Sequence, residues 1–166
     1  KPRQIFLSPR NGPRRHQHVG RRPDEPLNSP LQAFYQRLLQ ALKRPEAHEG
    51  HWQLWPCRPA WQGNGTWDQF IVFSWEQGAR RLLAAVNYGP SQAQCYVTLG
   101  LQGLAGHRFS LLDLLGEAHY ERDGDGLAGN GLYLDLPPWG YHLFELQEQK
   151  PARRTPASPA QLAVPV

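Results

Sequence analysis

The stretch DQFIVFSWEQGARRLLAAVNYGPSQAQCYVTL, residues 68–99, decides the fold. The run at its start alternates along the chain, and both sets of alternating side chains are mainly apolar. Such a run predicts a central β-strand that is covered on both faces. Turn-forming residues separate this run from others of strand length, and the three strands predicted in the stretch are 68–76, 80–88 and 92–99.

The same pattern extends in both directions from this stretch. Leu132, Leu134 and Leu136 alternate with Tyr133 and Asp135, which predicts a half-exposed strand. Short strands at this spacing, with no alternation of strands and helices, favour a mainly β fold: an antiparallel, Greek-key-like β-sandwich over residues 51–146. We interpret Asp123-Gly124-Asp125-Gly126 as a hairpin turn within it. The further strands predicted are 51–56, 107–115, 117–122, 131–136 and 139–146.

One amphipathic helix is predicted before the sandwich, over residues 30–44. Ser29 is a suitable N-cap, Pro30 suits the first helical position, and Pro45 ends the pattern. Apolar residues recur every three or four positions, so the helix needs a surface to pack on. We expect at least half of this stripe to be exposed in the isolated chain. The stripe consists of Leu31, Phe34, Tyr35, Leu38, Leu39 and Leu42.

The two ends of the chain differ from the rest in charge and in proline content. Residues 1–29 predict an irregular basic arm, and seven basic against two acidic residues give its first 25 positions a net charge of +5. The tail, residues 147–166, has a net charge of +2 and a composition typical of disorder. Residues 26–146 carry −3 and have no basic patch, which argues against nucleic-acid binding. No apolar run approaches the ~20 residues of a membrane span, so no membrane partner is expected.

Motifs for metals, cofactors and nucleophiles are missing from the sequence. Cys57 and Cys95 lie outside any CxxC motif; they are either buried thiols or a disulfide between strands. The histidine pairs lack the further ligands that complete a zinc site. No serine lies in a nucleophile elbow, and no glycine loop for phosphate is present. We therefore predict no catalytic residue, metal or cofactor in this chain.

The six tryptophans are the feature that best indicates a ligand. Tryptophan faces stack on the C–H edges of sugar rings in the way that they attract cations. Trp61 and Trp67 flank a Gly-Asn-Gly turn and are candidates for exposed, sugar-binding side chains. Trp52, Trp55 and Trp75 are instead expected in the core, where aromatic side chains dominate the packing of small β-domains.

Four segments together resemble the C-terminal end of an alpha-amylase family enzyme (glycoside hydrolase family 13). The resemblance implies that helix 30–44 is the last helix of a TIM-type barrel and that residues 51–146 are the β-sandwich that follows it. The chain starts at Lys1 and contains no Met, and we interpret it as a piece of a longer polypeptide. The four segments are GRRPDEPLNSPLQAFYQRLLQALKRPEA (20–47), LLAAVNYG (82–89), LLGEAHYERDG (114–124) and GLYLDLPPWGYHLFEL (131–146).

The resemblance also implies what the chain lacks. Family members use an Asp nucleophile and a Glu acid/base on barrel strands, and neither their Asn-His-Asp nor their Gly-x-Arg-x-Asp segment occurs here. We therefore expect this chain to be inactive without the missing barrel of the same polypeptide, its expected partner, through which it would meet alpha-glucan. The arm would lie near the substrate cleft of the intact enzyme, because barrel active sites form from the loops after strands. The arm residues implied are His16, His18, Arg21 and Arg22.

Three roles remain open at this point. The chain is a structural domain that covers an apolar face of the barrel, a domain that also contacts glycan, or a stand-alone carbohydrate-binding module with Trp61 and Trp67 as its platform. The sequence favours the structural role.

Overall fold

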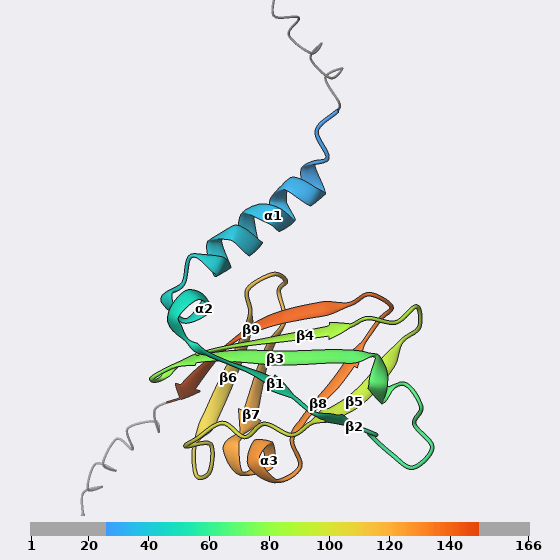
Figure 1. Ribbon diagram of the computed structural model, residues 1–166, viewed down its shortest axis with the longest axis vertical. Coiled ribbons are helices and arrows are strands. Elements are labelled where there is room, and N and C mark those ends of the chain that lie inside the picture. Colours follow the sequence, from blue (N-terminus) through green and yellow to red (C-terminus); the bar gives the residue numbers. More distant parts are fainter. Residues whose placement is uncertain (1–25, 150–166) are drawn as a thin grey trace, which may run out of the picture.

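A computed structural model of the protein describes residues 26–149. Its main body is a β-sandwich of two antiparallel sheets (Figure 1). The larger sheet has the strand order β1-β3-β4-β9-β6-β7 and the smaller one β2-β5-β8. The predicted fold class, a mainly β antiparallel sandwich, is therefore confirmed. The strands are β1 His51–Trp55, β2 Cys57–Arg58, β3 Phe70–Gln77, β4 Arg80–Asn87, β5 Ala93–Val97, β6 Arg108–Asp113, β7 His119–Asp123, β8 Leu132–Leu136 and β9 Tyr141–Gln149.

The core lies between the two sheets and follows from the period of two along each strand. On β3, Val72 is fully buried against the small sheet, whereas Phe73 and Trp75 face the opposite side. Both faces of β3 are apolar, as its sequence predicts. The apolar side chains on its outer face are partly covered by the helices. On β8, the leucines point into the core and Tyr133 and Asp135 point outward.

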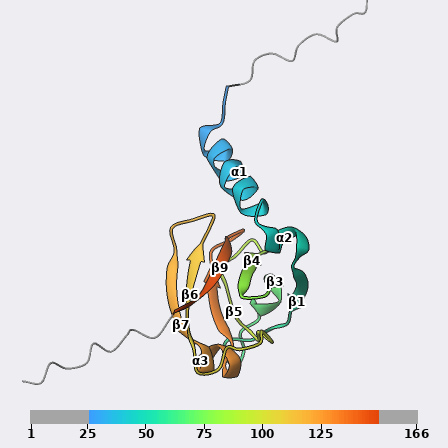
Figure 2. The ribbon, with the colours of Figure 1, turned by 90° about the vertical axis from the view of Figure 1, so that its left-hand side faces the viewer.

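Two helices pack on the outer face of the larger sheet. The long helix α1, Ser29–Leu42, stands away from the sandwich, and the short helix α2, Pro45–Glu49, follows at the sheet (Figure 2). Only the inner side of α1 reaches the sheet, through Phe34, Leu38 and Ala41. These side chains join a second, smaller core on strands β4 and β9.

The ends of these helices differ from the sequence prediction in detail. The N-cap of α1 is Asn28, whose side-chain oxygen accepts a hydrogen bond from the backbone N–H of Leu31 at 3.1 Å. Ser29 and Pro30 are thus the first helical residues, since an Asn side chain caps as well as a Ser. Pro45 is the first residue of α2, a position that tolerates its missing N–H.

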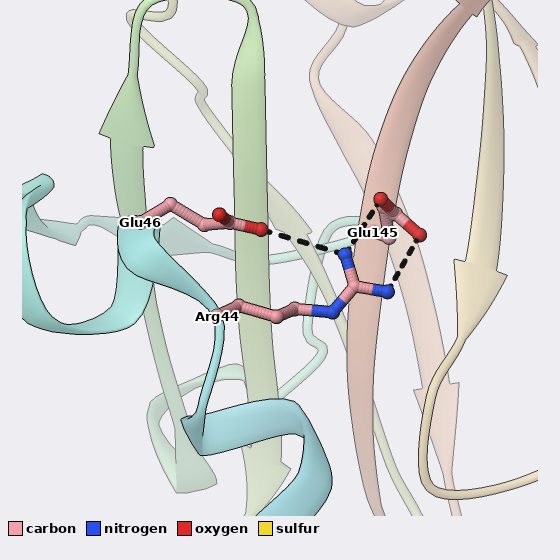
Figure 3. Close-up of polar contacts among 3 residues, drawn as sticks. All are labelled: Arg44, Glu46 and Glu145. Carbon is pink, nitrogen blue, oxygen red and sulfur yellow. Dashed lines mark hydrogen bonds and ion pairs between the residues drawn. The ribbon is translucent and has the colours of Figure 1, made fainter.

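An ion-pair cluster ties the two helices to the sandwich (Figure 3). Arg44 lies between α1 and α2, and its guanidinium donates two hydrogen bonds to the carboxylate of Glu145 on β9, at 2.7 and 3.1 Å. It also meets Glu46 at 3.4 Å, a residue that is only 2% exposed. The hydrogen bond to Glu145 is the main cause of a raised pKa of Arg44. The cluster sets the point at which α1 leaves the sheet.

The predicted hairpin turn at Asp123–Gly126 is wrong. A short helix, α3 Gly124–Gly129, begins there and joins β7 to β8. Asp123 is its N-cap and accepts a hydrogen bond from the Gly126 N–H at 3.1 Å. Glycine at 124 is required because a Cβ would collide with the carbonyl oxygen of Leu104.

Candidate functional site

The two tryptophans predicted as a sugar platform lie in different environments. Trp61 belongs to the loop between β2 and β3 and is 54% exposed. Trp67 starts a 3-10 helix, Trp67–Gln69, and packs against the main core. No contact between the two rings is present within residues 26–149. Of these two side chains, only Trp61 is thus open to a ligand over most of its surface.

The three tryptophans expected in the core are not all buried. Trp55 and Trp75 are half-buried, and the indole N–H of Trp55 donates to the Ser74 hydroxyl at 2.7 Å. Trp52 is 52% exposed, so its prediction as a core residue is wrong. The reason is its place on β1, the edge strand, where its side chain lies on the outer face of the sheet.

The four candidate residues of the arm, His16, His18, Arg21 and Arg22, lie outside the described residues. Their predicted closeness to a substrate cleft stays a prediction.

A buried carboxylate paired with a half-buried imidazole is the best-organised polar group of the sandwich. His142 Nδ1 lies 2.7 Å from Asp113 Oδ2, and the other carboxylate oxygen accepts the backbone N–H groups of Leu115 and Leu143 at 3.0 and 3.2 Å. The Asp113 side chain is 3% exposed. Burial alone would raise its pKa, but the hydrogen bonds from His142 and the two backbone amides outweigh burial and lower it.

His142 also lines a cleft at the open side of the sandwich. The cleft has a volume of about 240 Å³ and lies between β8, the edge strand of the small sheet, and the β7 side of the large one. Its floor is apolar and includes Leu111, Leu134 and Phe144. Tyr120 and Tyr133 line it as well and are 39% and 40% exposed.

Sequence reasoning missed this site because its parts are far apart in the chain. Asp113 and His142 come from β6 and β9, which pair only through the strand order of the large sheet. The sequence held one signal for this site, namely polar residues at positions that face inward. Tyr120, Arg122 and His142 lie on the same face of the large sheet as buried Leu111 and Phe144.

The two cysteines are free thiols on adjacent strands. A hydrogen bond between them lowers the pKa of Cys57 and raises that of Cys95, which burial raises further. Of the two possibilities left by the sequence, the structure has the unbonded one. Across residues 26–149, no group of three or more His, Cys, Asp or Glu side chains is placed to hold a metal ion. Among the described helices, none combines the length and apolar character of a membrane span.

Comparisons with known proteins found similar folds among solved structures only. No family model and no curated protein matches the sequence. Among solved structures, an Anoxybacillus alpha-amylase superposes with a TM-score of 0.50 and 13% identity, over 71% of this chain and 22% of that one. An alpha-amylase of Geobacillus thermoleovorans in complex with acarbose gives 0.47 and 14%, over 65% and 20%. A debranching enzyme of Nostoc punctiforme gives 0.42 and 20%, over 66% and 19%.

The chain thus spans about a fifth of each enzyme that it resembles. At these identities the likeness concerns the fold alone, and it involves a small part of the alpha-amylase.

Proposed function

We propose that this chain is the non-catalytic C-terminal part of an alpha-amylase-like glycoside hydrolase that acts on alpha-glucans. In this proposal, residues 1–29 lead out of the catalytic barrel, helix 30–44 is the last barrel helix, residues 51–146 form the C-terminal domain, and residues 147–166 are a tail. The fold likeness to the Anoxybacillus enzyme supports the class of protein.

The observation that carries the proposal is the exposed side of α1. Four of the six residues of its apolar stripe are open to solvent: Leu31 at 49%, Tyr35 at 51%, Leu39 at 58% and Leu42 at 37%. The expectation that at least half of the stripe is exposed is therefore confirmed. A contiguous exposed apolar surface marks an interaction site. The last helix of a barrel would have its stripe covered by the strands and helices beside it.

The clamp at Arg44 supports a structural role for the domain. It fixes the α1–α2 junction to β9 through a two-point ion pair, a geometry that restricts rotation. A sandwich held in this way to the last barrel helix would stabilise the barrel against opening at that helix.

The test is the size and activity of the natural polypeptide. An antibody raised against residues 51–146 should detect a protein several times larger than 18.9 kDa in the source cells. That protein should release reducing sugar from soluble starch, whereas the 166-residue chain should not. Detection of an 18.9 kDa protein alone would overturn the proposal.

The second candidate is a stand-alone carbohydrate-binding module in which Trp61 and Trp67 meet the glycan. The exposure of Trp61 favours it, and the half-buried position of Trp67 weakens it. Retention of the chain on an insoluble starch column, lost in a Trp61→Ala variant, would support this candidate. A Trp139→Ala variant is the matched control, since Trp139 is 57% exposed in a different turn.

A further inference from the structure

We infer that the cleft between β7 and β8 binds a small apolar carboxylate, whose charged group meets Arg122 and whose apolar part lies on the floor of the cleft. The inference adds a ligand class that the proposed function does not contain, and it does not depend on that function. It concerns the open side of the sandwich, away from Trp61 and from the exposed side of α1.

The cleft lies where the sandwich is open between two edge strands. β7 is the last strand of the large sheet and β8 the last of the small one, and helix α3 connects them (Figure 1). The inward side chains of β8 line the cleft together with two core residues of the large sheet, and all of them are apolar. Such a floor makes no hydrogen bonds and favours an apolar group. The floor consists of Leu111, Leu132, Leu134, Leu136 and Phe144.

Tyr120 and Arg122 on β7 supply the polar side of the cleft. They pair with Leu111 and Phe109 on β6, two core residues, so both side chains lie on the inner face of the large sheet. The guanidinium lies over the Tyr120 ring, 5.1 Å from its centroid, and donates to the backbone carbonyl of Glu121 at 2.9 Å. These contacts hold the cation at the cleft and use few of the five N–H groups of a guanidinium.

Arg122 is a half-buried cation that has no ion-pair partner within residues 26–149. The other two half-buried arginines of this range, Arg44 and Arg81, each have a carboxylate within 2.7 Å. Carboxylates on the neighbouring strands and at the start of α3 are engaged elsewhere, so the charge of Arg122 is left for a ligand. They are Asp123, which caps α3, Glu148, which meets His107, and Asp135, which binds Gln92 and Gln94 on the outer face.

The charge that the ligand carries follows from this arrangement. Asp113 lies four residues beyond Phe109, the residue in register with Arg122, which is about 13 Å along β6. Its carboxylate already accepts from two backbone amides and meets His142. A ligand carboxylate at Arg122 therefore stays clear of this acid and gains a two-point hydrogen bond. A cation would be repelled by Arg122, and a neutral apolar molecule would leave the guanidinium unpaired.

The size of the cleft limits the apolar part of the ligand to one ring. At about 240 Å³ the cleft is smaller than the ~300–1,000 Å³ pockets that enclose drug-sized ligands. A molecule of the size of benzoate, in which the carboxylate is attached directly to the ring, fits this limit. A ligand with so few atoms should bind with a dissociation constant in the millimolar range.

The test is an NMR titration of the full ¹⁵N-labelled chain at about pH 7 with benzoate, benzamide and benzamidine. These three probes share one shape and are an anion, a neutral amide and a cation. We expect benzoate to bind at least ~fivefold more tightly than benzamide, because charge-assisted hydrogen bonds are the stronger ones. Benzamidine should cause no shifts. The largest shifts with benzoate should fall at the amides of residues 120–122 and 132–136.

Variants of two arginines separate this site from a general effect of charge. Arg122→Gln should weaken benzoate binding at least ~fivefold, and Arg122→Lys should keep part of it, since an ammonium group retains the charge without the fork. Arg108→Gln is the matched control. Arg108 is exposed and precedes buried Phe109 on β6, so its side chain lies on the other face of the same sheet, and its loss should leave binding unchanged.

Four results would overturn the inference. They are the absence of shifts with benzoate, shifts confined to the loop around Trp61, equal binding of benzoate and benzamide, and an Arg122→Gln variant that binds benzoate as the unaltered chain does. Unchanged melting temperatures of the variants would show that weaker binding does not come from unfolding. Should Arg122→Gln not fold, the comparison of the three probes on the unaltered chain still decides. Failure of the proposed function is seen separately, in the size of the natural polypeptide, which this titration does not measure.

Discussion

Among the single residues of the sandwich, Asp113 makes the contacts whose loss should cost most. It is a buried carboxylate that satisfies two backbone amides and one imidazole. An Asp113→Ala variant leaves these donors without a partner, and each buried unpaired donor costs about 1–3 kcal/mol. We expect the free energy of unfolding at pH 7 to fall by about 3 kcal/mol, measured by urea denaturation. A loss below roughly 1 kcal/mol would contradict the role given to this carboxylate.

The same residue predicts a dependence of stability on pH. The folded-state pKa of Asp113 lies below its unfolded value, so the unfolded chain binds the proton more tightly. The contribution of Asp113 is therefore fully present above the unfolded pKa of about 3.9 and is lost as the pH falls through the folded pKa. Asp113→Asn cannot ionise and should show a shallower fall in stability between about pH 5 and pH 2. Identical slopes for this variant and the unaltered chain would exclude Asp113 as the source.

On the scale of elements, the clamp at Arg44 decides how firmly the helices hold to the sheet. Arg44→Met keeps the apolar stem and removes the two-point contact with Glu145. We expect a loss of about 1–2 kcal/mol and faster amide hydrogen exchange in α2. Arg44→Lys should restore little, because an ammonium group cannot reproduce the fork. Arg37→Met, on the exposed side of α1, is the control, and full rescue by Lys would show that charge alone is sufficient.

Helix α3 offers a matched pair of glycines. A Cβ at Gly124 would collide with the backbone of Leu104, whereas one at Gly129 would meet open space. Gly124→Ala should destabilise the protein by about 2 kcal/mol or more, because the backbone carbonyls of Leu104 and His107 would have to move. Gly129→Ala should be neutral or stabilising by up to about 1 kcal/mol. Urea denaturation of both variants checks the difference, and equal stabilities would mean that this contact is relaxed in solution.

The elements also show what a sequence can predict here. The strands were predictable because alternation is a local property, and β3 and β8 follow it residue by residue. Asp123-Gly124-Asp125-Gly126 was misread because Asp and Gly serve a helix N-cap as readily as a hairpin turn. The Asp113–His142 pair was not predictable, since it depends on β9 lying between β4 and β6. Strand order is set by packing of the whole chain, not by any local pattern.

For the molecule as a whole, the exposed apolar side of α1 predicts self-association, whether or not the chain belongs to an enzyme. The isolated chain leaves Leu31, Tyr35 and Leu39 in water, each about half exposed. Apolar side chains in this state associate with one another when nothing else covers them, and each buried side chain contributes up to about 1.5–3 kcal/mol. We expect the chain to self-associate with rising concentration, as seen by multi-angle light scattering.

The variant that tests this prediction is Leu31→Gln/Leu39→Gln. Glutamine has a helix propensity close to that of leucine, so the helix should persist in circular dichroism while the apolar surface is lost. Phe34 and Leu38 remain in contact with the sheet, and the melting temperature should change little. Gln32→Ala/Gln36→Ala, which alters other exposed positions of α1, should associate as the unaltered chain does. A chain that stays monomeric up to millimolar concentration would contradict the prediction and would leave the exposed stripe without a detectable binding role of its own.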